Sequence, residues 1–129
     1  MRFTRTGTLG ALANSLDMKI HYLRCGTDCP LGGALFDGFS KGPLATIPCA
    51  AQLVETSEGL VLVDTGYGSA DVAHPHPRLS KAFRALLNIR FRPEETALHQ
   101  VRALGYSPSD VRHIVLTHLD FDHAGGIED

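Results

Sequence analysis

Thr117-His-Leu-Asp-Phe-Asp-His-Ala-Gly-Gly126 is the segment that decides how this chain is interpreted. It places four side chains that can bind a metal ion, His118, Asp120, Asp122 and His123, within six residues. An apolar run precedes the segment and a pair of glycines closes it. Clusters of histidine and carboxylate mark metal or catalytic sites. The alternative is a solvated polar turn without chemistry, but so dense a cluster favours a metal site.

The spacing of the segment predicts how its side chains converge. In an extended chain, residues two apart share a face, so His118, Asp120 and Asp122 are expected to point one way. Leu119 and Phe121 are then expected to point into the core. His123 turns the corner, and the glycines after it allow close backbone approach and the start of a helix. Imidazole and carboxylate ligands suit zinc, iron or manganese, so we expect one or two divalent ions.

Length and composition limit the other possibilities. A chain of 129 residues with 43% hydrophobic content can hold one domain with a core. The net charge of −2 predicts no nucleic-acid partner, and no apolar run reaches the ~20 residues of a transmembrane segment. Three cysteines do not form a disulfide framework, which predicts a cytoplasmic protein. We expect residues 1–17 to be a disordered extension rather than a secretory signal, with the domain occupying 18–129.

Two strands are expected to form a hairpin upstream of the metal segment. Residues 46–55 and 60–64 are apolar runs that flank Ser57-Glu58-Gly59. The second run is apolar throughout, which predicts a central strand buried on both faces. It ends at Asp64, and a carboxylate at the end of a buried strand is costly unless it accepts hydrogen bonds. A simple strand-ending turn is the alternative for Asp64.

Other histidines and cysteines are not expected to bind a metal. A strand over 18–23 leads into a turn-rich loop that holds Cys25 and Cys29. A metal clip there would need a second pair of ligands, so structural cysteines are the better interpretation. His74 and His76 alternate with prolines, which favours an exposed extended segment. Only the segment at 117–126 therefore has the spacing of a metal site.

Two helices are expected between the hairpin and the metal segment. Residues 78–92 alternate basic and apolar side chains at helical spacing, which fits a surface helix or a lid over an amphiphilic substrate. Pro93 is expected to open a second helix. Its buried stripe would contain Ala97, Leu98, Val101 and Leu104. A strand over 111–117 then delivers the metal segment, and His99 and His113 are expected to be packing or surface residues.

The metal segment resembles the signature of the metallo-β-lactamase superfamily, which usually reads His-x-His-x-Asp-His. The resemblance covers residues 18–129 and implies an α/β (α+β) fold: the N-terminal half of an αββα sandwich, a mixed sheet with outer helices. Carried over, His118 and Asp120 would bind a first metal, and Asp122 and His123 a second. Asp64 would lie beneath them and orient a ligand or the loop. Zinc is implied by the family, whereas an aspartate at position 120 favours manganese or iron.

The resemblance also implies a function, that of a metal-dependent hydrolase close to the acyl-homoserine lactonases. A metal-bound hydroxide would attack the carbonyl of a small ester or lactone, and Asp122 would position the nucleophile or relay its proton. The alternatives are a glyoxalase II-like thioesterase and a non-catalytic binding or regulatory protein on a degenerate scaffold. Because the second half of such a domain supplies further ligands, we expect these 129 residues alone to be inactive, with an open sheet edge and an exposed apolar face. A homodimer is a further expectation.

Overall fold

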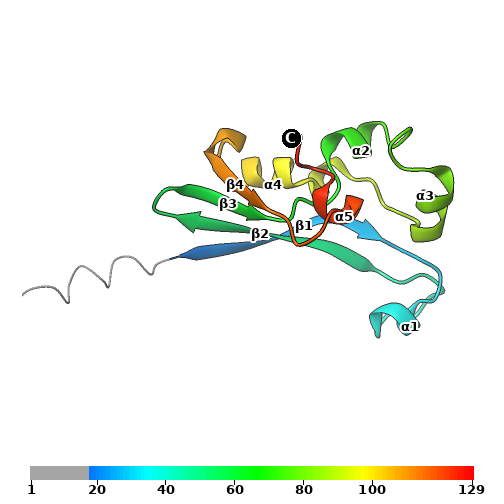
Figure 1. Ribbon diagram of the computed structural model, residues 1–129. Helices are drawn as coiled ribbons and strands as arrows, with labels where there is room; N and C mark the ends of the chain where they lie inside the picture. Colours follow the sequence, from blue (N-terminus) through cyan, green and yellow to red (C-terminus); the bar gives the residue numbers. More distant parts are fainter. Residues whose placement is uncertain (1–17) are drawn as a thin grey trace, which may run out of the picture.

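The computed structural model of the protein describes residues 18–129. These residues form a four-stranded mixed sheet in the order β1-β2-β3-β4 (Figure 1). Its strands are β1 (Lys19–Asp28), β2 (Ile47–Thr56), β3 (Gly59–Val63) and β4 (Val111–Val115). The first three strands are antiparallel to one another, and β4 is parallel to β3. The expectations for residues 1–17 lie outside the described part of the chain.

The predicted hairpin is confirmed, because β2 and β3 pair antiparallel from Gln52 with Val63 to Thr56 with Gly59. The prediction that β3 is buried on both faces was wrong. Leu60 and Leu62 are buried, whereas Val61 and Val63 are only half-buried. The reason is that side chains along a strand alternate between its two faces, and only one face of this sheet packs against the helices.

The first strand is longer than predicted and includes part of the expected loop. β1 continues to Asp28, with a register shift between Arg24 and Thr27. Gly26 lies in this irregularity at φ +123°, and a Cβ there would lie 2.6 Å from the ring of Tyr67. A glycine-centred bulge lets the strand bend and resume pairing. Cys25 and Cys29 are buried free thiols, as expected for structural cysteines.

The helices are shorter than the sequence pattern predicts. They are α1 (Ala34–Asp37), α2 (Ser69–Ala73), α3 (Lys81–Leu87), α4 (Ala97–Ala103) and α5 (Phe121–Ala124). Helix α3 begins after Ser80, whose side chain caps it, and ends at Asn88 in the left-handed region. Pro93–Glu95 form a separate 3₁₀ turn, and Thr96 caps α4 by accepting a hydrogen bond from His99 N. Leu104 follows the last turn of α4 and is 41% exposed, so its predicted burial was wrong.

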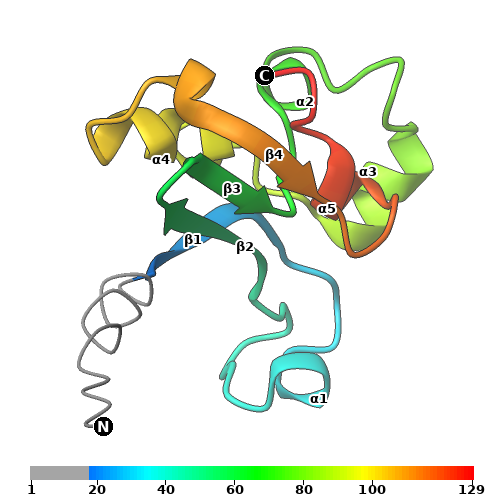
Figure 2. The same cartoon turned by 60° about the vertical axis from the view of Figure 1, so that its left-hand side comes forward.

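The core lies between one face of the sheet and α4. Its central cluster consists of Leu23, Cys25, Ala51, Leu53, Leu60, Leu62, Ala97 and Val101. The sheet register places Tyr22, Gln52, Val63 and Val115 side by side on the other face. Tyr22 and Val115 are exposed there, which confirms the expected exposed apolar face among the described residues. Figure 2 shows α1 apart from the sheet, on the connection between β1 and β2.

The topology brings the metal segment to one end of the sheet. Because β3 and β4 are parallel and adjacent, Asp64 and Leu116 follow the carboxyl ends of neighbouring strands. The chain then turns into α5, which lies on the same side of the sheet as α4 (Figure 1). Within residues 18–129, no helix has the length and apolar character that crossing a membrane requires.

Candidate metal centre

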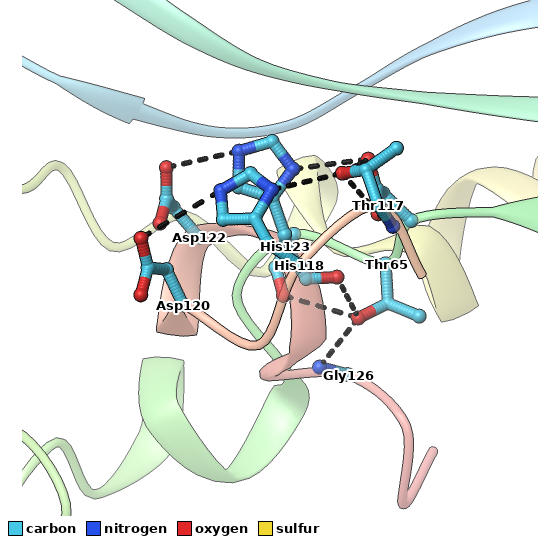
Figure 3. A network of polar contacts seen from close by, with 9 residues as sticks. Thr65, Thr117, His118, Asp120, Asp122, His123 and Gly126 are labelled. Carbon is cyan, nitrogen blue, oxygen red and sulfur yellow. Dashed lines mark hydrogen bonds and ion pairs between the residues drawn. The ribbon is translucent and has the colours of Figure 1, made fainter. Parts of the chain in front are cut away.

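Three of the four predicted ligands converge. One donor atom from each of His118, Asp122 and His123 lies within 4.8 Å of the other two. The two imidazole rings are 3.8 Å apart between centroids, and His123 Nε2 lies 3.3 Å from Asp122 Oδ2 (Figure 3). All three side chains are at least partly accessible. Three protein ligands with room for a further group are the donor set of a catalytic divalent metal, so these residues fit such an ion.

Asp120 lies outside this donor group. It is the N-cap residue of α5, its side chain is 80% exposed, and its Oδ2 is 3.6 Å from His118 Nε2. The predicted alternation fails because the extended chain ends at Asp120. Beyond it, successive residues are helical and turn by about 100° each. Leu119 is 81% exposed rather than in the core. The role of Asp120 as a ligand therefore stays a prediction.

Asp64 binds the backbone of the segment and one of the converging histidines. Its Oδ1 accepts a hydrogen bond from Thr117 N at 2.8 Å, and its Oδ2 accepts one from Thr117 Oγ1 at 2.8 Å. His123 Nδ1 lies 3.0 Å from Asp64 Oδ2. An ionised carboxylate only accepts, so Nδ1 carries the proton; in a neutral ring this leaves the lone pair of Nε2, on the side facing Asp122, for a metal ion. This is the contact that metal-binding histidines usually make with an outer carboxylate.

The electrostatics of Asp64 support this arrangement. Burial opposes its ionisation, but the hydrogen bonds from Thr117 and His123 together bring its pKa below the ordinary value. The residue adopts φ +58°, a conformation that non-glycine residues rarely take and that aspartate tolerates better than most. Strained backbone at a strand end is common where a side chain must be aimed at a site.

Thr65 fastens the other end of α5 to the sheet. Its backbone N and its Oγ1 donate to the carbonyl oxygen of His123 at 2.7 and 2.9 Å. The same hydroxyl accepts a hydrogen bond from Gly126 N at 2.9 Å (Figure 3). Sequence reasoning did not single out this residue. The feature that could have pointed to Thr65 is its position next to Asp64, directly after the end of β3.

A second donor group adjoins the first and was not predicted. Asp28 and Cys49 are buried, and one donor atom of each lies within 4.8 Å of a carboxylate oxygen of Asp122. Asp28 Oδ1 accepts a hydrogen bond from Tyr67 Oη at 3.1 Å. Asp28 is in β1, Cys49 in β2 and Asp122 in α5, so only the tertiary fold brings the three residues together. His74, His76, His99 and His113 lie outside both donor groups found in residues 18–129.

The charge state of Asp28 should make the stability of the metal-free protein depend on pH. The pKa of Asp28 is raised to about 6, because burial and the nearby Asp122 carboxylate raise it by more than the Tyr67 hydrogen bond lowers it. A folded-state pKa above the unfolded one means that the folded protein binds more protons between pH 4 and pH 6. The free energy of unfolding should therefore fall by about 1–2 kcal/mol as the pH rises through this window.

Urea denaturation of the full-length, metal-depleted protein from pH 4 to pH 7 tests this expectation. Asp28→Asn should flatten the decline, because the substituted side chain does not ionise. Glu58→Gln, on the exposed hairpin turn, is the matched control and should keep the profile of the unmodified protein. Parallel profiles for the unmodified protein and Asp28→Asn would show that Asp28 does not ionise at the expected pH.

Histidine and carboxylate donors at the carboxyl ends of parallel strands in a mixed sheet define a divalent-metal site on an α/β scaffold. The family sequence model of the metallo-β-lactamase superfamily matches residues 46–129 of this chain. The chain therefore belongs to that superfamily. The fold class, a mixed sheet with helices from the N-terminal part of such a domain, is confirmed.

Named relatives agree with this assignment. A "probable metallo-hydrolase" of Mycobacterium tuberculosis is 49% identical over 112 residues, which are 87% of this chain and 32% of that protein. An N-acyl homoserine lactonase of Bacillus thuringiensis is 28% identical over 108 residues, 84% of this chain and 43% of the relative. A solved N-acyl homoserine lactone hydrolase, with N-hexanoyl-L-homoserine bound at its catalytic metal center, matches with a TM-score of 0.63 and 28% identity. That match covers 85% of this chain and 44% of the solved one. The chain thus spans between about a third and less than half of the length of these relatives.

Proposed function

We propose that this chain is part of a metal-dependent hydrolase that opens a lactone or cleaves another small ester. The observation that carries the proposal is the convergence of His118, Asp122 and His123 above Asp64. The choice of a lactone is supported by the 28% identical hydrolase whose structure holds an acyl-homoserine product at its metal center. Fold alone does not select a substrate, so the substrate class has to be measured.

The residues of the site divide the chemistry among them. A divalent ion, when bound, would supply a Lewis acid that makes water nucleophilic near neutral pH and polarises the substrate carbonyl. His118 and His123 would hold that ion through ring nitrogens, and Asp64 keeps His123 in the required tautomer. The carboxylate of Asp122 is half-buried beside His123. It would orient the attacking water by accepting its hydrogen bond, and would take up the proton that the water loses.

Ring opening is the reaction to assay first. The full-length protein should be depleted of metal, loaded separately with zinc, manganese or iron(II), and given N-hexanoyl-homoserine lactone, a simple aryl ester and a glutathione thioester. We expect metal-dependent acid release from the lactone or the ester. A preference for the thioester would favour a glyoxalase II-like activity. Metal binding without hydrolysis of any substrate would instead indicate a binding protein, the alternative that the exposed Asp120 favours.

Position 120 should set the metal preference. A carboxylate at this position is a harder ligand than imidazole, so Asp120→His should raise the affinity for zinc relative to manganese on the order of tenfold. Competition with a chromophoric chelator measures both affinities. The control is Glu58→His, an identical gain of imidazole on the exposed hairpin turn. An unchanged zinc-to-manganese ratio in Asp120→His would remove Asp120 from the ligand set.

A further inference from the structure

We propose that Asp71 and Arg78 form a positioning pair that holds the turn behind the metal ligands and thereby sets the metal affinity of the site. The inference rests on the proposed metal centre. Asp71 lies in α2 and is fully buried. Its Oδ2 accepts a hydrogen bond from Gly68 N at 3.2 Å, and its Oδ1 lies 3.3 Å from Arg78 Nε. A buried carboxylate requires such partners, because leaving it unpaired is strongly unfavourable.

Asp71 and the neighbouring Gly68 pack closely against Gly125, at the end of α5. A Cβ on Gly125 would lie 2.5 Å from Asp71 Oδ2, and a Cβ on Gly68 would lie 2.3 Å from the carbonyl oxygen of Gly125. Neither distance occurs between real side chains and their neighbours, so only glycine fits at both positions. The Asp71 carboxylate therefore forms the surface on which the end of α5 rests.

The guanidinium of Arg78 extends this anchor along the chain. Its Nη1 donates to Glu128 Oε1 at 2.6 Å. Ser69, in the first turn of α2, donates from both its N and its Oγ to Asp129 Oδ2. Residues after α5 are thus held by α2 and by the loop that follows it. The donors in α5 lie between this anchor and the contacts that Asp64 makes.

The position of this anchor implies an effect on binding rather than on folding alone. Asp71 touches none of the converging donors, so it acts only by fixing Gly125, the residue that ends α5. Removing one partner of a buried ion pair lowers stability, because the other charge is left buried and unpaired. Metal sites, in contrast, lose affinity when ligands move by about half an ångström. The pair should therefore affect metal affinity as well as unfolding, and the two effects have to be measured separately.

Asp71→Asn in the full-length protein tests the proposal, with cobalt(II) as the probe. The variant keeps the size of the side chain but loses the charge that faces Arg78. We expect cobalt affinity to fall about tenfold or more, with altered visible absorption bands of the bound ion. The matched control is Asp110→Asn, because Asp110 likewise accepts a hydrogen bond from a backbone N three residues earlier, at 2.8 Å from Ser107 N. It lies in a different turn and should leave cobalt binding unchanged.

A second variant covers the case in which Asp71→Asn does not fold. Arg78→Gln removes the charge from the other side and leaves the hydrogen bond between Asp71 and Gly68 in place. It should weaken cobalt binding in the same way. Unchanged affinity and spectrum in either folded variant, whatever the change in melting temperature, would overturn the positioning role. Failure of the unmodified protein to bind cobalt would overturn the proposed metal centre instead, so the two failures are distinguishable.

Discussion

Asp122→Asn is expected to lower the rate of lactone hydrolysis by the full-length protein roughly 10²–10⁴-fold. An amide does not take up a proton, and it is a much weaker metal ligand than a carboxylate. Because Asp122 Oδ2 lies only 3.3 Å from His123 Nε2, the substitution changes the charge at the centre of the donor group. Initial rates at several substrate concentrations, with the bound metal measured in each sample, separate loss of metal from loss of chemistry.

Two comparisons make this result specific. Asp110→Asn, the same chemical change in an exposed 3₁₀ turn, should retain the activity of the unmodified protein. Excess metal should restore occupancy in Asp122→Asn without restoring the rate. Turnover that equals that of Asp110→Asn would remove Asp122 from the mechanism and leave it, at most, a structural residue.

Substitution of Asp64 should have the second large effect, with two separable parts. Asp64→Ala removes the charge-assisted hydrogen bonds that Thr117 and His123 make with this buried carboxylate, so the free energy of unfolding should fall by about 2–4 kcal/mol. Asp64→Asn keeps an oxygen for Thr117 N and tolerates the positive φ, so it should retain most of that stability. It no longer holds His123 in one tautomer, and metal affinity should fall about 10–100-fold.

Chemical denaturation and metal titration on both variants test these expectations. The lowered pKa of Asp64 adds a pH dependence. The stability it contributes is present above the ordinary aspartate pKa and is lost as the pH falls through the folded-state value. Asp64→Asn should therefore lose less stability in acid than the unmodified protein does. Wild-type metal affinity in Asp64→Asn would show that the contact with His123 does not govern binding.

Local sequence signals predicted much of the sheet. The hairpin of β2 and β3 follows from two apolar runs around a short polar turn, and β4 follows from the apolar run before the metal segment. Its last two predicted residues, 116 and 117, leave the strand. The helix starts were less predictable. Pro93 begins a separate 3₁₀ turn, whereas α4 itself begins after Thr96, and both residues are typical of helix starts.

The candidate site was only partly predictable, for a different reason. The cluster of donors was visible in the sequence, but its geometry depended on where the extended chain ends. Because α5 begins directly after Asp120, the alternation of an extended chain stops there, and His123 joins His118 and Asp122 in the donor group. The contacts of Asp28 with Tyr67 and of Asp71 with Gly125 join residues far apart in the chain, and no local pattern signals them.

The most direct test of the metal centre is anomalous diffraction from crystals of the full-length protein loaded with zinc or cobalt(II). The account predicts an anomalous peak bound by His118, Asp122 and His123, with metal-to-ligand distances of about 2.0–2.2 Å. A fully loaded protein with no anomalous density at these three side chains, or with its metal bound elsewhere, would contradict it.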